Sequence, residues 1–204
     1  MSSSQSPDIP VEPGRRVLIA EDEALIRLDL KEMLEEEGYR VIGEAGDGAQ
    51  AVALAVELRP DLVILDVQMP VMDGLVAAEQ IAAHRIAPVV ILTAFSQRDL
   101  VERARTAGTM AYLVKPFQKH DLVPAIEIAV SRYAENAALE AEVKDLLERL
   151  ESRKVIDQAK GRLMQQRSWT EPQAFSWIQR AAMDRRISMR SVAEAILAEQ
   201  RRDG

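Results

Sequence analysis

The chain has 204 residues, enough for one ordinary domain and a smaller second one. Apolar residues make up 48% of it but aromatic residues only 4%, so Val, Ile, Leu and Ala must fill its cores. The absence of cysteine excludes disulfides and thiolate metal sites and suits a cytoplasmic location. No apolar run reaches the roughly 18 residues of a membrane span. Residues 1–14, rich in Ser and Pro, are expected to form a disordered arm rather than a signal peptide.

The net charge of −7 is distributed unevenly. Residues 1–151 hold 15 Lys and Arg against 27 Asp and Glu, a net of −12, whereas residues 152–204 hold 11 against 6, a net of +5. This change of sign predicts different partners for the two parts, with an anionic partner for the second. The alternative is a small helical domain with a basic, solvated face.

Strand-like and helix-like segments alternate over the first 120 residues. The β-branched runs lie near residues 15–20, 40–45, 62–66, 89–93 and 111–115. Helical spacing between them is marked by Leu25, Leu28, Met33 and Leu34, by Ala51, Leu54, Ala55 and Leu58, by Leu75 and Ile81, and by Leu100, Ala104 and Ala107. This alternation predicts βαβ units with right-handed crossovers, and therefore an α/β domain with a five-stranded, doubly wound parallel sheet.

Residues 119–151 are expected to form one long helix, because they contain no Gly and their one proline, Pro124, lies near the start, where it is tolerated. The residues Leu139, Val143, Leu146 and Leu150 recur at spacings of 4, 3 and 4. This spacing is typical of a coiled-coil seam, which would form a homodimer, but it is shorter than the roughly three or four heptads of a firm assignment. The alternative is a helix that packs this stripe on its own chain.

Three amphipathic helices are expected in residues 152–204, forming a small bundle around one core. The first helix, about Arg153–Gln166, would bury Val155, Ile156, Ala159 and Leu163. The second opens with the capping box Thr170–Gln173 and would bury Ala174, Phe175, Ile178 and Ala181. The third starts near Ser188 and would bury Val192, Ala195 and Ile196. Trp169, Phe175 and Trp177 are assigned to this core rather than to base stacking.

Polar side chains follow four of the predicted strands. Glu21 and Asp22 follow the first, Asp66 ends the third, Thr93 ends the fourth and Lys115 follows the fifth. The carboxyl ends of parallel strands meet at one sheet edge, where open α/β folds bind ligands. Three carboxylates would repel one another without a cation, and an all-oxygen site favours Mg²⁺, with the backbone carbonyl of Gln68 as a further ligand.

Such a site is suited to phosphoryl transfer. Asp66 can act as an oxygen nucleophile toward phosphorus. Transfer also needs charge compensation on the phosphoryl oxygens, which Mg²⁺ and the Lys115 ammonium would provide, and Thr93 could hydrogen-bond one of these oxygens.

The motifs Glu21-Asp22, Asp66 with Met69-Pro70-x-x-Asp73-Gly74, Thr93-Ala94 and Lys115-Pro116-Phe117 resemble the receiver domain of two-component response regulators, over roughly residues 15–130. The resemblance implies a flavodoxin-like fold and phosphorylation of Asp66 by a sensor histidine kinase. It implies Mg²⁺ held by Asp22, Asp66 and the Gln68 carbonyl, with help from Glu21, which stands where many members have Asp. It also implies a cis bond between Lys115 and Pro116 and a switch aromatic, Tyr112, which turns inward as Thr93 approaches the phosphoryl group.

The tail resembles an ANTAR output domain, a family that binds RNA hairpins and acts in transcription antitermination. The resemblance lies in Ile156-Asp157-Gln158-Ala159-Lys160-Gly161-x-Leu163-Met164, Ala174-Phe175, Ala181-Ala182-Met183-Asp184 and Val192-Ala193-Glu194-Ala195-Ile196. Residues 131–151 would then be a helical linker and 152–204 the output domain. Lys160 is the leading candidate for an RNA contact, and Arg153, Arg180, Arg185, Arg186 and Arg190 are the others. Arg162 and Arg167 are assigned to solvated surface.

Two other classes compete with a phosphorylation-switched RNA-binding regulator. A DNA-binding response regulator would use the tail as a helix-turn-helix variant, but Glu194 and Glu199 beside Arg190 make a poor major-groove surface. An aspartyl-phosphate phosphohydrolase typically has a second Asp two residues after the nucleophile, where this chain has Gln68. We therefore expect a non-enzymatic regulator. Phosphorylation, by adding up to about two negative charges, would either pair two receivers or release the basic tail from the acidic receiver.

Overall fold

The computed structural model describes residues 14–94 and 109–198. The chain divides into two compact units, Met1–Ala137 and Ala138–Gly204, and each is described by itself. Residues 1–13 of the expected N-terminal arm lie outside the described residues, as does the expected helix marked by Leu100, Ala104 and Ala107.

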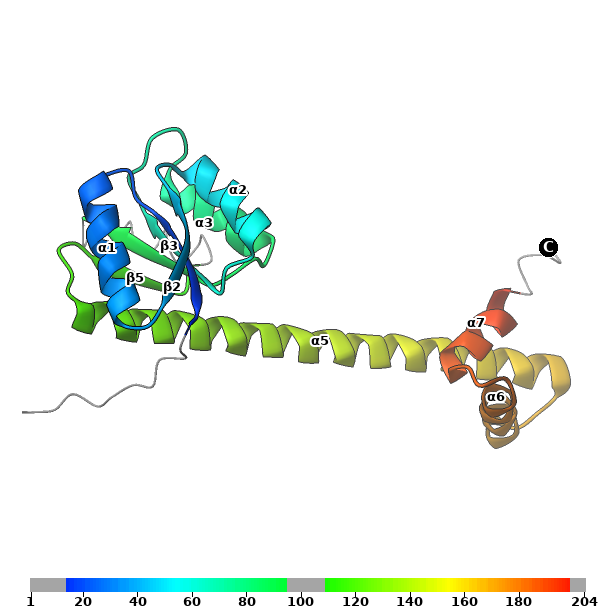
Figure 1. Cartoon of the computed structure of the whole chain (residues 1–204). Helices are drawn as coiled ribbons and strands as arrows, with labels where there is room; N and C mark the ends of the chain where they lie inside the picture. The colour runs from blue at the N-terminus through cyan, green and yellow to red at the C-terminus, as the bar shows by residue number, and fades with distance from the viewer. Residues whose placement is uncertain (1–13, 95–108, 199–204) are drawn as a thin grey trace, which may run out of the picture. The chain divides into compact units, whose positions relative to one another are not determined.

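The first unit is built on a five-stranded parallel sheet in the order β2-β1-β3-β4-β5 (Figure 1). Its strands are β1 (Arg16–Ala20), β2 (Arg40–Ala45), β3 (Leu62–Asp66), β4 (Val89–Thr93) and β5 (Ala111–Val114). β3 and β4 are buried at every position, which explains their continuous apolar sequences, because a parallel sheet is covered on both faces. The structure confirms the predicted doubly wound α/β fold, with strand bounds within one residue of those expected.

Helices cover both faces of the sheet (Figure 1). α2 (Gly48–Leu58) and α3 (Gly74–Ala83) pack on one face, mostly through alanines and Ile81. α1 (Ala24–Glu36) and the first turns of α5 (Lys119–Arg167) pack on the other. Asp47 and Asp73 cap α2 and α3 by accepting hydrogen bonds from backbone N–H groups at 2.9 and 2.7 Å.

The inward face of α1 differs from the prediction. Leu30 and Leu34 are buried, whereas Leu25 and Leu28 are 82% and 52% exposed. At 3.6 residues per turn Leu25 and Leu28 lie about 140° and 160° around the helix from Leu30, so one face cannot bury all of them. An apolar face near the start of α1 is therefore open to solvent.

The second unit contains the C-terminal turns of α5, α6 (Glu171–Arg185) and α7 (Met189–Ala198), which share one apolar core. The first helix expected there is not separate, because α5 continues from Lys119 to Arg167 without a break. The sequence between residues 150 and 154 contains no Gly or Pro, and the Ser152 hydroxyl donates to the Glu148 carbonyl at 2.7 Å within the helix. The Ser188 hydroxyl accepts from the Ser191 backbone N–H at 3.0 Å, as expected for a helix cap.

Two core assignments in this unit were wrong. Phe175 is 41% exposed and is not part of the core. In α7 the buried residues are Val192, Ala193 and Ile196, whereas Ala195 is exposed, because the inward face is turned toward the side of Ala193.

The stripe on α5 that was predicted as a seam is not covered by its own chain. Leu139, Val143, Leu146 and Leu150 are 51–63% exposed, so the described residues give no support to the alternative in which they pack intramolecularly. No helix in the described parts of the chain has both the length and the apolar character needed to cross a membrane.

Candidate functional site

Three carboxylates converge at the C-terminal edge of the sheet. Glu21 and Asp22 follow β1, Asp66 ends β3, and one oxygen of each carboxylate lies within 4.8 Å of those of the other two. Glu21 and Asp66 are buried, whereas Asp22 is exposed. The structure thus confirms the acidic cluster, which is closed on the protein side and open to solvent on the other.

Both oxygens of the Asp66 carboxylate accept a hydrogen bond. Lys115, just after β5, lies 2.8 Å from Asp66 Oδ1, and the Gln68 backbone N–H donates to Oδ2 at 3.0 Å. The Lys115 ammonium also donates to Glu21 Oε2 at 2.6 Å. These contacts fix the orientation of the carboxylate and bring the backbone of Gln68 next to it.

The charges in this cluster influence each other strongly. Burial raises the pKa of the Glu21 carboxyl, and the hydrogen bond from Lys115 offsets only part of that effect. Burial acts to lower the pKa of Lys115, but its bonds to Asp66 and Glu21 outweigh burial and raise it. One ammonium therefore pairs with two members of a cluster of three carboxylates, which leaves an excess of negative charge for a cation to balance.

The loop after β3 holds Asp66 in place. The Gly74 backbone N–H donates to the Val67 carbonyl at 2.9 Å, which brings the start of α3 against the end of β3. A Cβ on Gly74 would lie 1.8 Å from the Asp66 carbonyl oxygen, so only glycine fits there. Val71, at the tip of this loop, has a positive φ of 64°, which is uncommon for a β-branched residue.

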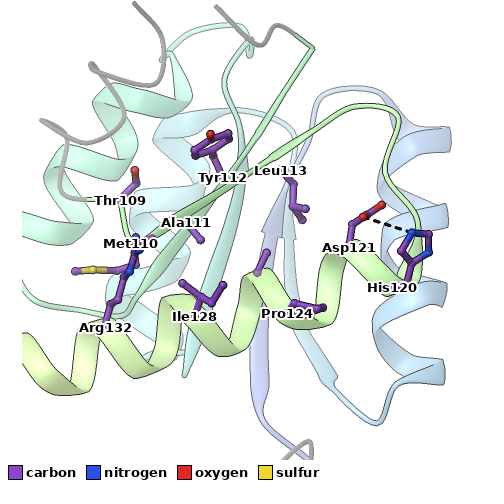
Figure 2. A pocket seen from close by; sticks show the side chains of 11 residues that line it. Thr109, Met110, Ala111, Tyr112, Leu113, His120, Asp121, Pro124, Ile128 and Arg132 are labelled. Atoms are coloured by element: carbon purple, nitrogen blue, oxygen red, sulfur yellow. Dashed lines mark hydrogen bonds and ion pairs between the residues drawn. The ribbon is translucent and has the colours of Figure 1, made fainter. Parts of the chain in front are cut away.

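The other residues expected at this edge lie on β4 and β5. Thr93 is buried at the end of β4, and its carbonyl accepts from the Lys115 backbone N–H at 2.7 Å. The peptide bond between Lys115 and Pro116 is cis, as the family resemblance implied. Tyr112 is 47% exposed and lines a pocket of about 570 Å³ between β5 and the start of α5, together with Pro124 and Ile128 (Figure 2).

In the second unit, three of the predicted RNA contacts are already ion-paired. Lys160 lies 2.6 Å from Asp157 and 2.7 Å from Glu171, and only 14% of its side chain is exposed. Arg190 lies 2.8 Å from Glu194, and Arg153 lies 3.9 Å from Asp157. Their positive charge is therefore partly neutralised within the chain.

The remaining arginines divide into two groups. Arg180, Arg185 and Arg186 are exposed and form no ion pair with any other described residue. Arg162 and Arg167, which the sequence analysis assigned to solvated surface, have specific partners. Arg162 donates to the Ile196 carbonyl at 2.8 Å, and the Arg167 guanidinium lies 5.0 Å from the centre of the Trp169 ring. Side-chain geometry of this kind leaves no periodic signal in the sequence.

The comparisons with known proteins agree with this geometry. The sequence matches the family models of the response regulator receiver domain over residues 17–127 and of the ANTAR domain over residues 144–197. The structure resembles the receiver domain of a modulated diguanylate cyclase from Desulfovibrio desulfuricans G20, with a TM-score of 0.55 and 32% identity over 59% of this chain and 97% of that one. The chain therefore belongs to the response regulators in which a receiver domain is followed by an ANTAR domain.

One relative extends over nearly the whole chain. The transcriptional regulatory protein PdtaR of Mycobacterium tuberculosis H37Rv is 67% identical over 183 residues, which cover 90% of this chain and 89% of that protein. The chemotaxis protein CheY of Thermotoga maritima is 40% identical over 114 residues, covering 55% of this chain and 95% of CheY. The chain is thus a regulatory protein of the PdtaR type and not an enzyme, as the sequence predicted.

Proposed function

We propose that Asp66 accepts a phosphoryl group from a phosphohistidine of a sensor kinase. In this step the P–N bond of the donor breaks, and a P–O bond forms to a carboxylate oxygen of Asp66. The observation that carries the proposal is the buried, doubly hydrogen-bonded Asp66 carboxylate beside Lys115 at an acidic sheet edge. The Lys115 ammonium, which pairs with the Asp66 carboxylate, can pair with a phosphoryl oxygen once the group is transferred. Thr93 can donate a hydrogen bond to another phosphoryl oxygen.

The donor set fits Mg²⁺, which takes few carboxylates and keeps several waters. Asp22, Asp66 and the Gln68 carbonyl would hold the ion. Glu21 belongs to the same carboxylate cluster and would assist in binding it. A bound Mg²⁺ would neutralise charge on the phosphoryl oxygens. Asp22 is exposed, so the ion would enter the cluster from the side on which Asp22 lies.

For the second unit we propose that it binds RNA hairpins and acts in transcription antitermination. The ANTAR match and the net charge of +5 on residues 152–204 support this function. The alternative, a DNA-binding output, has less support, because Arg190 on α7 is paired with Glu194 and leaves little free positive charge for a major groove. Phosphorylation would control RNA binding, either by pairing two receivers, with the seam on α5 as part of the dimer, or by releasing the basic residues 152–204 from the acidic receiver.

The phosphoacceptor assignment is tested by Asp66→Asn. We expect the wild-type chain to gain one phosphoryl group from a small-molecule phosphodonor with Mg²⁺, and Asp66→Asn to gain none, as measured by intact mass. Asp73→Asn is the matched control, since Asp73 lies in the same loop and Asn caps helices about as well as Asp. Phosphoryl uptake by Asp66→Asn at the wild-type rate would show that the assignment is wrong.

The output assignment is tested by binding to a pool of transcripts and to duplex DNA, with and without a phosphoryl mimic and Mg²⁺. Retention of hairpin RNA that increases with the mimic is the expected result. A preference for duplex DNA would support the alternative function, and RNA binding that does not respond to the mimic would contradict the proposed control by phosphorylation.

A further inference from the structure

A surface pocket of the second unit contains both tryptophans of the chain. Its volume is about 410 Å³, and it is lined by Trp169, Pro172, Gln173, Ser176, Trp177 and Arg180. Each tryptophan packs one part of its ring system on the core formed by α5, α6 and α7 and is only partly buried. The assignment of Trp169 and Trp177 to the core is therefore incomplete, because the same two rings also line an open pocket.

The two indoles are supported from within the unit. Their ring centres lie 6.2 Å apart with the planes tilted by 47°. The Arg167 guanidinium lies 5.0 Å from the centre of the Trp169 ring and 5.8 Å from that of Trp177, a cation–π arrangement that restrains both. A restrained aromatic surface can stack a flat ligand at little cost in side-chain entropy.

The charge around the pocket favours an anionic ligand. Its lining includes Arg180 and no carboxylate. By contrast, a pocket of about 520 Å³ beside Lys160 and Arg153 is also lined by Asp145, Glu148 and Asp157. In that pocket the three carboxylates offset the three cations Arg149, Arg153 and Lys160, so little net positive charge is left for a phosphate. At the tryptophan pocket a phosphate meets the Arg180 guanidinium, which has no ion pair among the described residues.

We propose that the tryptophan pocket receives one unpaired base of an RNA hairpin loop, with Arg180 contacting the adjoining phosphate. This inference rests on the RNA-binding function proposed above and names a subsite for it. Specific recognition of RNA uses loop bases that are unstacked and free to lie on aromatic rings. The Gln173 amide and the Ser176 hydroxyl offer hydrogen-bond donors and acceptors for the edge of the base.

The test uses the intrinsic fluorescence of the full-length chain, because Trp169 and Trp177 are its only tryptophans. A labelled hairpin RNA that the chain retains from the transcript pool is titrated, and its anisotropy reports binding while tryptophan emission reports the pocket. We expect the emission to be quenched in parallel with binding. A duplex made of the stem alone, without the loop, should bind more weakly and leave the emission unchanged.

A second set of hairpins makes each loop nucleotide abasic in turn, which removes the base but keeps the phosphate. We expect one position to abolish the quenching and to weaken binding about 10- to 100-fold, the loss that corresponds to one base–aromatic stack. The salt dependence of binding should stay the same for that RNA, because no phosphate has been removed.

The Arg180 contact is tested by Arg180→Gln, with Arg149→Gln as the matched control on a guanidinium that is paired with Asp145. Arg180→Gln should reduce the slope of log K against log salt by about 0.7 to 0.9, and Arg149→Gln should change it much less. Hairpin binding without any change in tryptophan emission would overturn the subsite but leave the RNA-binding function in place. Absence of hairpin binding by anisotropy would overturn both.

Discussion

Asp66 illustrates how its neighbours decide what a single carboxylate can do. Its two oxygens are held by Lys115 and by the Gln68 backbone, so the side chain presents a fixed geometry at the sheet edge. Lys160, the leading candidate for an RNA contact, also has close partners within its own unit. Because it bridges Asp157 on α5 and Glu171 on α6, Lys160 ties two helices of the second unit together. Lys160 therefore helps to hold the fold of this unit, and its contact with RNA stays a prediction.

At this scale we expect Gly74→Ala to destabilise the receiver strongly. The added Cβ would lie 1.8 Å from the Asp66 carbonyl oxygen, which is backbone and cannot move aside without displacing β3. The free energy of unfolding, measured with urea, should fall by about 3 kcal/mol or more. Gly46→Ala is the control, because a Cβ there meets nothing within 4 Å, and it should change stability by less than about 0.5 kcal/mol. Equal effects of the two substitutions would contradict the packing described for Gly74.

At the scale of elements, α1 combines a buried face with an exposed apolar one. Leu30 and Leu34 hold it on the sheet, whereas Leu25 and Leu28, three residues apart, lie on the far, solvent-exposed side of the helix. Leu25 is three residues from the exposed Asp22 of the acidic cluster. A kinase domain that brings its phosphohistidine to Asp66 would cover this part of α1.

We therefore expect Leu25→Gln to slow phosphotransfer from a phosphorylated sensor kinase that acts on the wild-type chain. Loss of about 1 kcal/mol of apolar burial corresponds to a roughly fivefold lower rate. Phosphorylation by a small-molecule donor should be unaffected, since Leu25 is 82% exposed on α1 and is not a member of the acidic cluster. Val56→Gln, at a 49% exposed position on α2, is the control. Equal slowing with both donors would indicate damage to the site instead of lost docking.

At the scale of the whole molecule, the acidic residues 1–151 and the basic residues 152–204 share one helix. α5 begins in the receiver, where Leu122, Ile126 and Ala129 pack on the sheet, and ends in the second unit, where Ala159 and Leu163 are buried. Between these ends it exposes the stripe formed by Leu139, Val143, Leu146 and Leu150. An exposed stripe at heptad spacing favours pairing with a second copy of the chain.

The homodimer is tested by Leu146→Glu, which would place an unpaired charge in the seam. We expect dissociation of the phosphorylated dimer to become easier by about 3 kcal/mol or more, which is over 100-fold in the dissociation constant, as measured by sedimentation. Ala141→Glu adds the same charge to α5 outside the stripe and should leave the dimer intact. A wild-type chain that stays monomeric after phosphorylation would contradict the seam.

The amino-acid sequence by itself determined the parallel sheet, its strand bounds and the residues at its edge. These follow from local patterns, since β-branched runs, turn residues and the polar groups after each strand are read from neighbouring positions. Only the tertiary structure decided which face of α1 is buried and that Lys160 is bridged by two carboxylates. It also decided that Arg167 restrains two tryptophans at an open pocket. The physical reason is that these features depend on contacts between side chains distant in the sequence, and periodicity carries no information about them.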